Sequence, residues 1–89
     1  MVQVRFTKNI QRHVACPPED VMGRDVREVL DAYFARHPAA REYVVDEQHA
    51  LRRHMVIFVQ GKPIRDRTTL SDEVSEDGTV DVMQALSGG

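Results

Sequence analysis

Alternation of apolar and polar residues near both ends of the chain constrains the fold more than any other feature. Residues 2–7 and residues 79–86 both alternate in this way, and the apolar members are Val2, Val4, Phe6, Val80 and Val82. A period of two is typical of a strand with one buried face. We therefore expect a strand at each end, both facing the same apolar layer.

A helix is expected between these strands, over residues 26–36. Asp25 suits the N-cap position, and Glu28 three residues later completes a capping box. The apolar residues that follow recur at helical spacing and form one stripe: Val26, Val29, Leu30, Tyr33 and Phe34. Pro38 ends the helix at His37, because the residue before a proline disfavours the α conformation.

The segment after the helix predicts further strands. Residues 53–59 are rich in Val, Ile and Phe and give the strongest strand signal of the chain. Gln60-Gly61 turns that strand, and Ile64 begins a short edge strand. Before the strand, a hairpin is expected at residues 43–50.

The order of elements predicts an α+β fold. Residues 12–16 are expected to form a second strand, after a turn at residues 8–11 and before the stop at Pro17-Pro18. Two strands, a helix and further strands favour a mixed sheet of four to five strands with one main helix across one face. The last strand is expected beside the first, in the middle of the sheet.

Length and composition fit one small domain, residues 1–83, with an extended tail at residues 84–89. The formal net charge of -2 argues against a nucleic-acid partner, because such modules usually carry a basic excess. A single cysteine, Cys16, fits a reducing, cytoplasmic setting. No signal peptide and no apolar run near the ~18 residues of a membrane helix is visible, so no membrane partner is expected.

Two glycines, Gly88 and Gly89, end the chain and are the candidate site of chemistry. Terminal glycines alone indicate only flexibility, but here they follow a predicted strand directly through Ala85, Leu86 and Ser87. Six extended residues reach roughly 20 Å. Without Cβ atoms the last two can thread a narrow channel toward a nucleotide, and Leu86 is expected to anchor the tail in a partner's apolar pocket.

These segments resemble the MoaD/ThiS family of sulfur carriers over essentially the whole chain. Residues 51–64 resemble the family's central strand and turn, residues 79–89 its last strand and glycine-glycine tail, and residues 25–38 its helix. The resemblance implies a β-grasp (ubiquitin-like) fold. It also implies a carrier co-substrate that is not itself an enzyme and binds no cofactor stably.

The resemblance further implies a reaction sequence carried out by other proteins. An adenylyltransferase like the ubiquitin-activating enzymes would use ATP to adenylate Gly89, and a sulfur donor would convert it to a thiocarboxylate. A sulfur-accepting enzyme would then use that sulfur for molybdopterin, thiazole, cysteine or another product. Residues 83–87 lack the prolines of many molybdopterin carriers, and Gln60-Gly61 replaces the usual Asn-Gly. The length is more similar to that of cysteine-synthesis-type carriers, and the pathway stays open.

Strand parity predicts a partner-binding surface. If Met55, Ile57 and Val59 face the helix, Val56 and Phe58 face the other way. If Val80 and Val82 face the helix, Met83 faces out with Asp81. A β-grasp helix leaves that face open, so Val56, Phe58 and Met83 would form an apolar patch near the base of the tail. The alternative is that Phe58 or Met83 packs on neighbours or on the expected hairpin.

Other candidates favour neither catalysis nor a metal site. Cys16 has no Cys-x-x-Cys partner and suits a small buried hydrophobe. The acidic pairs at residues 46–47 and 72–73 suit solvated turns. The arginines at 52–53 and 65–67 suit an ordinary charged surface better than one that steers an acidic partner. The four histidines show no metal-ligand spacing; they are His13, His37, His49 and His54.

Three functions are therefore open at this point. The first is a sulfur carrier that ends in a thiocarboxylate. The second is a ubiquitin-like modifier joined to lysines through Gly89. The third is a non-covalent β-grasp interaction module, whose activity would survive the loss of Gly89.

Overall fold

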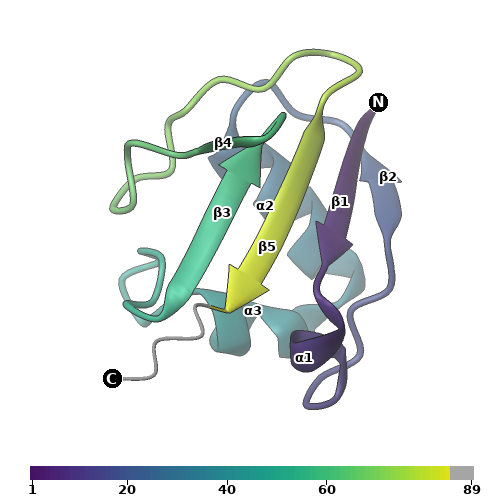
Figure 1. The fold of residues 1–89 in the computed structure, drawn as a ribbon, viewed down its shortest axis with the longest axis vertical. Coiled ribbons are helices and arrows are strands. Elements are labelled where there is room, and N and C mark those ends of the chain that lie inside the picture. Colours follow the sequence, from purple (N-terminus) through teal and green to yellow (C-terminus); the bar gives the residue numbers. More distant parts are fainter. Residues whose placement is uncertain (85–89) are drawn as a thin grey trace.

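A computed structural model describes residues 1–84 of the chain (Figure 1). Five strands form one sheet in the order β2-β1-β5-β3-β4. The central pair, β1 and β5, is parallel and the other pairs are antiparallel, so the prediction of the last strand beside the first is confirmed. The strands are β1 (Val2–Phe6), β2 (Glu19–Val21), β3 (Met55–Val59), β4 (Lys62–Pro63) and β5 (Thr79–Gln84).

Three helices accompany the sheet: α1 (Lys8–Gln11), α2 (Val26–Arg36) and α3 (Pro38–Val44). Figure 1 shows the main helix α2 behind the sheet, while none of the three described helices crosses the face toward the viewer. A mixed sheet with one main helix across one face is the expected α+β, β-grasp arrangement. Within residues 1–84, none of the helices has the length and apolar character needed to cross a membrane.

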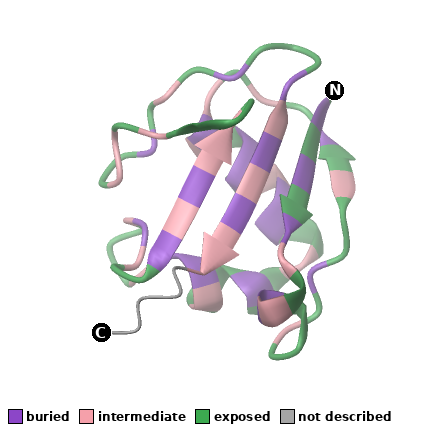
Figure 2. Ribbon diagram, in the orientation of Figure 1, coloured by how far each residue is buried: buried purple, intermediate pink, exposed green. Residues whose placement is uncertain are grey.

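The core fills the layer between the sheet and α2. Alternate residues of β1, β3 and β5 are buried, and Figure 2 shows this alternation along β3 and β5. Each fully buried apolar side chain stabilises the fold by about 1.5–3 kcal/mol. The strand members of this layer are Val2, Val4, Phe6, Met55, Ile57, Val80 and Val82, and α2 contributes Val26, Val29, Leu30, Tyr33 and Phe34.

The start of α2 is capped almost as the sequence predicts. The Asp25 carboxylate accepts a hydrogen bond from the Glu28 backbone N–H over 2.8 Å. The Glu28 carboxylate accepts from the backbone N–H of Arg24 over 2.9 Å, one residue before the N-cap. Both bonds satisfy N–H groups near a helix start that lack partners inside the helix.

The second strand lies later in the chain than predicted. Residues 12–16 form a turn and irregular backbone, and β2 follows Pro17 and Pro18 instead of preceding them. Because β2 is an edge strand, prolines just before it remove no hydrogen bond from the sheet interior. The Tyr33 hydroxyl donates to the Pro17 carbonyl over 2.7 Å and ties this segment to α2.

The predicted hairpin at residues 43–50 is wrong in its first strand, because Tyr43 and Val44 belong to α3. Its turn is present, since Val45 pairs with Leu51 in an isolated antiparallel bridge. Ala40 and Val44 lie four residues apart on this helix and both are fully buried. Their shared burial outweighs the strand preference of valine. The turn predicted at residues 8–11 is likewise helical and forms α1.

The turn after β3 is confirmed. Gln60 (φ 50°) and Gly61 (φ 84°) both adopt the left-handed conformation of a two-residue hairpin turn. The strand before it begins at Met55, later than the predicted residue 53. The edge strand after it is β4, which lies just before the predicted start at Ile64.

The long polar segment between β4 and β5 is fastened to α2. Leu70 and Val74 of this segment are buried. The Val26 N–H donates to the Asp72 carbonyl over 3.0 Å, and the Val74 N–H donates to the Arg24 carbonyl over 2.9 Å. The segment is therefore an ordered cover over the start of α2.

Candidate partner-binding face

The face of the sheet that α2 leaves open carries the predicted apolar residues. In the antiparallel pair β3–β5, Val56 lies across from Met83 and Phe58 across from Asp81. Val56, Phe58 and Met83 are partly exposed, whereas Ile57 is fully buried on the other face. The predicted parity is therefore confirmed, and Val56, Phe58 and Met83 are named the open-face patch below.

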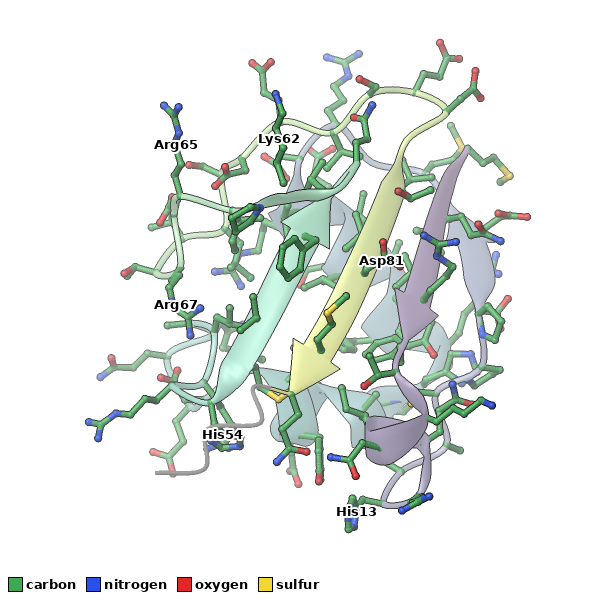
Figure 3. The ribbon with its side chains drawn as sticks, in the orientation of Figure 1. His13, His54, Lys62, Arg65, Arg67 and Asp81 are labelled. Carbon is green, nitrogen blue, oxygen red and sulfur yellow. The ribbon has the colours of Figure 1, made fainter. Side chains whose placement is uncertain are left out.

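An ion pair borders the open-face patch on the β1 side. Arg5 lies across from Asp81 in the parallel pair β1–β5. Its Nε donates to Oδ1 over 2.7 Å and its Nη2 donates to Oδ2 over 2.9 Å. The hydrogen bonds to Asp81 raise the pKa of Arg5 above its ordinary value. An exposed pair adds little net stability, but this one neutralises the carboxylate in the middle of the face (Figure 3).

Basic side chains border the face on the β4 side. Figure 3 places Lys62 and Arg65 along this edge, and His54 beside the start of β3. Lys62 and Arg65 are exposed, and neither takes part in the ion pairs found among residues 1–84. Asp72 and Glu73 lie beside Lys62 and Arg65 at this edge. The edge therefore carries charges of both signs.

Arg67 has a structural role that the sequence does not indicate. Its Nη2 donates to the carbonyls of Arg52 (3.0 Å), Arg53 (3.2 Å) and Met55 (2.8 Å). One side chain thus ties the segment after β4 to the start of β3, and Figure 3 shows Arg67 directed toward that end of the strand. The prediction that these arginines are ordinary surface charge is therefore wrong for Arg67.

Asp66 organises the same segment. Its carboxylate accepts hydrogen bonds from the backbone N–H groups of Thr68 (3.1 Å) and Thr69 (2.9 Å) and from the hydroxyls of Ser71 (2.6 Å) and Thr69. The bonds from Ser71 and then Thr69 hold the pKa of Asp66 well below its usual range. The carboxylate is therefore a fixed acceptor for the loop.

Strand β5 leads toward the predicted site of chemistry. Gln84 is its last residue and lies across from Met55 of β3. The strand thus includes residue 84, where the extended tail is predicted to begin. The predicted tail sites Leu86, Ser87, Gly88 and Gly89 lie outside the described residues.

The remaining candidates lie elsewhere and do not assemble a reactive centre. Cys16 is 2% exposed, and burial raises the pKa of its thiol, which disfavours the reactive thiolate. His37 contacts Glu19 over 2.8 Å, and this hydrogen bond lowers the pKa of the Glu19 carboxyl. Within residues 1–84, no group of His, Cys, Asp and Glu side chains is suited to hold a metal ion.

The ion pair between Arg5 and Asp81 is the feature of this face that sequence reasoning missed. The signal was present, since both residues occupy outward positions of their alternating strands. Their pairing, however, depends on the register between β1 and β5, which are joined across most of the chain. The alternation along one strand shows on which face of the sheet a residue lies. The register between two strands shows which residue of the next strand lies beside it.

The fold is shared with small proteins of known structure. A chain of the BexX/CysO complex from Amycolatopsis orientalis is 24% identical, with a TM-score of 0.83 and 100% of both chains covered. CysO from Mycobacterium tuberculosis is 18% identical, with a TM-score of 0.80, and the match covers 97% of this chain and 100% of that one. SAMP1 from Haloferax volcanii is 22% identical, with a TM-score of 0.77 and coverage of 99% and 98%.

No protein-family model and no curated protein sequence matches the chain. The likeness to solved structures nevertheless extends over nearly the whole length of each chain. It confirms the β-grasp fold, and it confirms the resemblance to the MoaD/ThiS carriers at the level of the fold.

Proposed function

We propose that this chain is a sulfur carrier whose working group is the carboxylate of Gly89. An ATP-dependent adenylyltransferase would bind the chain. The carboxylate would then attack the α-phosphorus of ATP, and pyrophosphate would leave. A sulfur donor would displace AMP and leave a thiocarboxylate, from which a sulfur-accepting enzyme would take the sulfur. The chain supplies a substrate and no catalytic group, and ATP is bound by the enzyme rather than by the carrier.

The observation that carries this proposal is the relation between β5 and the open-face patch. β5 is a central strand with β1 and β3 on its two sides, and the sequence beyond it ends in Gly88-Gly89. Met83 of the patch immediately precedes Gln84, the end of the strand. An enzyme that docks on the patch would therefore meet the tail at its origin, and residues without Cβ atoms could approach a nucleotide in its active site.

The comparisons support a protein partner for the proposed carrier. One of the structures with this fold is a complex of CysO with a second protein, BexX. As part of this proposal, we assign the open-face patch, Leu86 and Ser87 to contacts with the activating enzyme. A cytoplasmic location is part of the same proposal, since the activating enzyme uses ATP.

A second candidate function is protein modification through Gly89. SAMP1, which shares the fold, is named a small archaeal modifier protein. Modification would use the same adenylated carboxylate, but a lysine amine instead of a sulfur donor would attack it. The two functions thus share Gly89 and the open-face patch and differ in the nucleophile.

The mass of the intact protein purified from its native host tests the proposal. A gain equal to the difference between sulfur and oxygen, located on Gly89, supports the carrier, while a ladder of larger conjugates supports the modifier. Deletion of Gly89 should abolish both products. Gly89→Ala keeps the chain length and the carboxylate but adds a Cβ atom, so it should reduce both products without abolishing them. A cellular activity that survives deletion of Gly89 would show instead a non-covalent interaction module.

A further inference from the structure

We propose that Asn9 is a positioning residue that fixes the root of the C-terminal tail for activation. Asn9 Nδ2 donates a hydrogen bond to Gln84 Oε1 over 3.1 Å, in a partly buried contact between α1 and the end of β5. Residues 85–89 continue from Gln84. The contact therefore lies where the proposed working end of the chain leaves the sheet, and its role rests on the proposed function.

Asn9 can act in this way because α1 is held firmly in place. An isolated helix of one turn is unstable in water, so its order comes from its anchors. Ile10 is fully buried in the core. The Gln11 side-chain amide donates to the Phe6 carbonyl over 2.9 Å, and the Thr7 N–H donates to the Val82 carbonyl over 3.2 Å. These contacts tie α1 to both β1 and β5.

Gln84 is constrained from two directions. Its backbone lies in the ladder with Met55 of β3, and its side chain is held by Asn9. Met83, the residue before it, belongs to the open-face patch. The two constraints thus join the patch and the root of the tail into one rigid unit. An enzyme that docks on the patch would receive the tail along a fixed direction.

Loss of the contact should affect binding rather than chemistry. A single partly buried hydrogen bond contributes modestly, and its loss corresponds to about a two- to tenfold change in an equilibrium. Without it, the end of β5 is less ordered in the free carrier, and the enzyme must order it on binding. That cost raises KM for the carrier while kcat stays unchanged, because the bound tail is held by the enzyme.

Kinetics of adenylation with Asn9→Ala test the assignment, with the full chain as the varied substrate of its cognate adenylyltransferase. Alanine favours the helix, so α1 should persist. We expect KM to rise about two- to tenfold with unchanged kcat. Asn9→Asp should restore the wild-type KM. Its carboxylate can accept a hydrogen bond from the Gln84 side-chain nitrogen once that amide flips and exchanges the positions of its nitrogen and oxygen. Lys8→Ala, at an exposed neighbouring position on α1, is the matched control and should leave KM unchanged.

A double-mutant cycle isolates the contact itself. If Asn9 acts through Gln84, the variant with both Asn9→Ala and Gln84→Ala should have the same KM as either single variant. An unchanged KM in Asn9→Ala with an active wild type would overturn the positioning role alone. So would a loss of melting temperature without a change in KM, or an equal effect of Lys8→Ala. Failure of the wild type to be adenylated at Gly89 would overturn the proposed function, and the positioning role with it.

Discussion

Two adjacent residues of β3, Ile57 and Phe58, should separate stability from partner binding. Ile57 is fully buried between the sheet and α2, whereas Phe58 is partly exposed in the open-face patch. Alanine at each position removes a large apolar side chain from the same strand, one residue apart. We expect Ile57→Ala to destabilise the fold and leave activation intact, and Phe58→Ala to do the reverse.

The expected size of each effect follows from how deeply the side chain is buried. Truncation of a fully buried isoleucine to alanine costs about 2–5 kcal/mol, and in a domain of this size each kcal/mol lowers the melting temperature by about 4–8 °C. Ile57→Ala should therefore lower it by more than about 8 °C. The cross-strand contacts of Phe58 contribute only about 0.2–1 kcal/mol. Phe58→Ala should therefore lower the melting temperature by less than about 8 °C. As a central aromatic anchor, Phe58 should contribute about 2 kcal/mol to binding, which is about 30-fold in KM.

Thermal denaturation followed by circular dichroism and adenylation kinetics with the carrier as varied substrate measure the two effects. The kinetic comparison belongs at a temperature where both variants are folded. Equal losses of melting temperature would contradict the assignment of the two faces. An unchanged KM for Phe58→Ala would refute the interface, whatever the stability of the variant.

The structure also shows why alanine is a cleaner change here than aspartate. Phe58→Asp would place a charge in the apolar patch and so oppose docking of a partner. Asp81, however, lies directly across from Phe58, and like charges at facing positions destabilise a sheet. Phe58→Asp would also compete for the guanidinium of Arg5, which is paired with Asp81. Its effect would therefore combine lost binding with lost stability.

Two further predictions concern loops away from the face. Hydrogen bonds from Ser71 and Thr69 lower the pKa of Asp66 in the folded protein. The ionised carboxylate therefore stabilises the fold at any pH above its unfolded pKa of about 3.9. This stabilisation is lost as the pH falls from that value through the lower pKa of the folded state. Asp66→Asn should therefore melt below the wild type at pH 7, with a difference that shrinks in strong acid; a difference independent of pH would contradict this. Gln60 has a left-handed backbone (φ 50°) that costs a residue with an ordinary side chain about 1 kcal/mol. Gln60→Asn should raise stability in urea unfolding, and a decrease would show that the glutamine side chain makes contacts worth more than the strain.

The sequence predicted the elements in which a regular apolar pattern extends over several residues and only one face is buried. The alternation in β1 and β5 and the stripe Val26 to Phe34 on α2 both describe one buried face. For such elements, local pattern and tertiary packing agree. Asp25 and Gln60-Gly61 were predicted for a related reason, because capping and turn chemistry depend on a few neighbouring residues.

The errors fall on short elements whose structure is decided by distant contacts. α1 has one fully buried residue, Ile10, and α3 has two, Ala40 and Val44. Their burial depends on the rest of the fold and leaves little periodic signal. The short strand β2 exists because it pairs with β1, and Pro17-Pro18 misled the prediction because prolines are compatible with the start of an edge strand.

At the candidate site, the sequence predicted the face but not its surroundings. The open-face patch required only parity, which alternation supplies. The ion pair of Arg5 with Asp81, the three bonds of Arg67 and the contact of Asn9 with Gln84 all join segments far apart in the chain. Such partners depend on register and loop path, and neither can be obtained from one local pattern.

These surroundings bear on how a carrier of this kind would work. A tail that must enter the active sites of two enzymes in turn needs an accessible terminus. The residue from which it leaves the domain must also be held in place. A loop would give a variable origin, because loops open locally at low cost. β5 instead lies between β1 and β3, so moving its end requires breaking ladder hydrogen bonds and the contact of Gln84 with Asn9. The open-face patch lies on the same strand pair. In the proposed function, the sheet would thus be a rigid support that fixes where the tail begins, and the partner enzymes would carry out the chemistry.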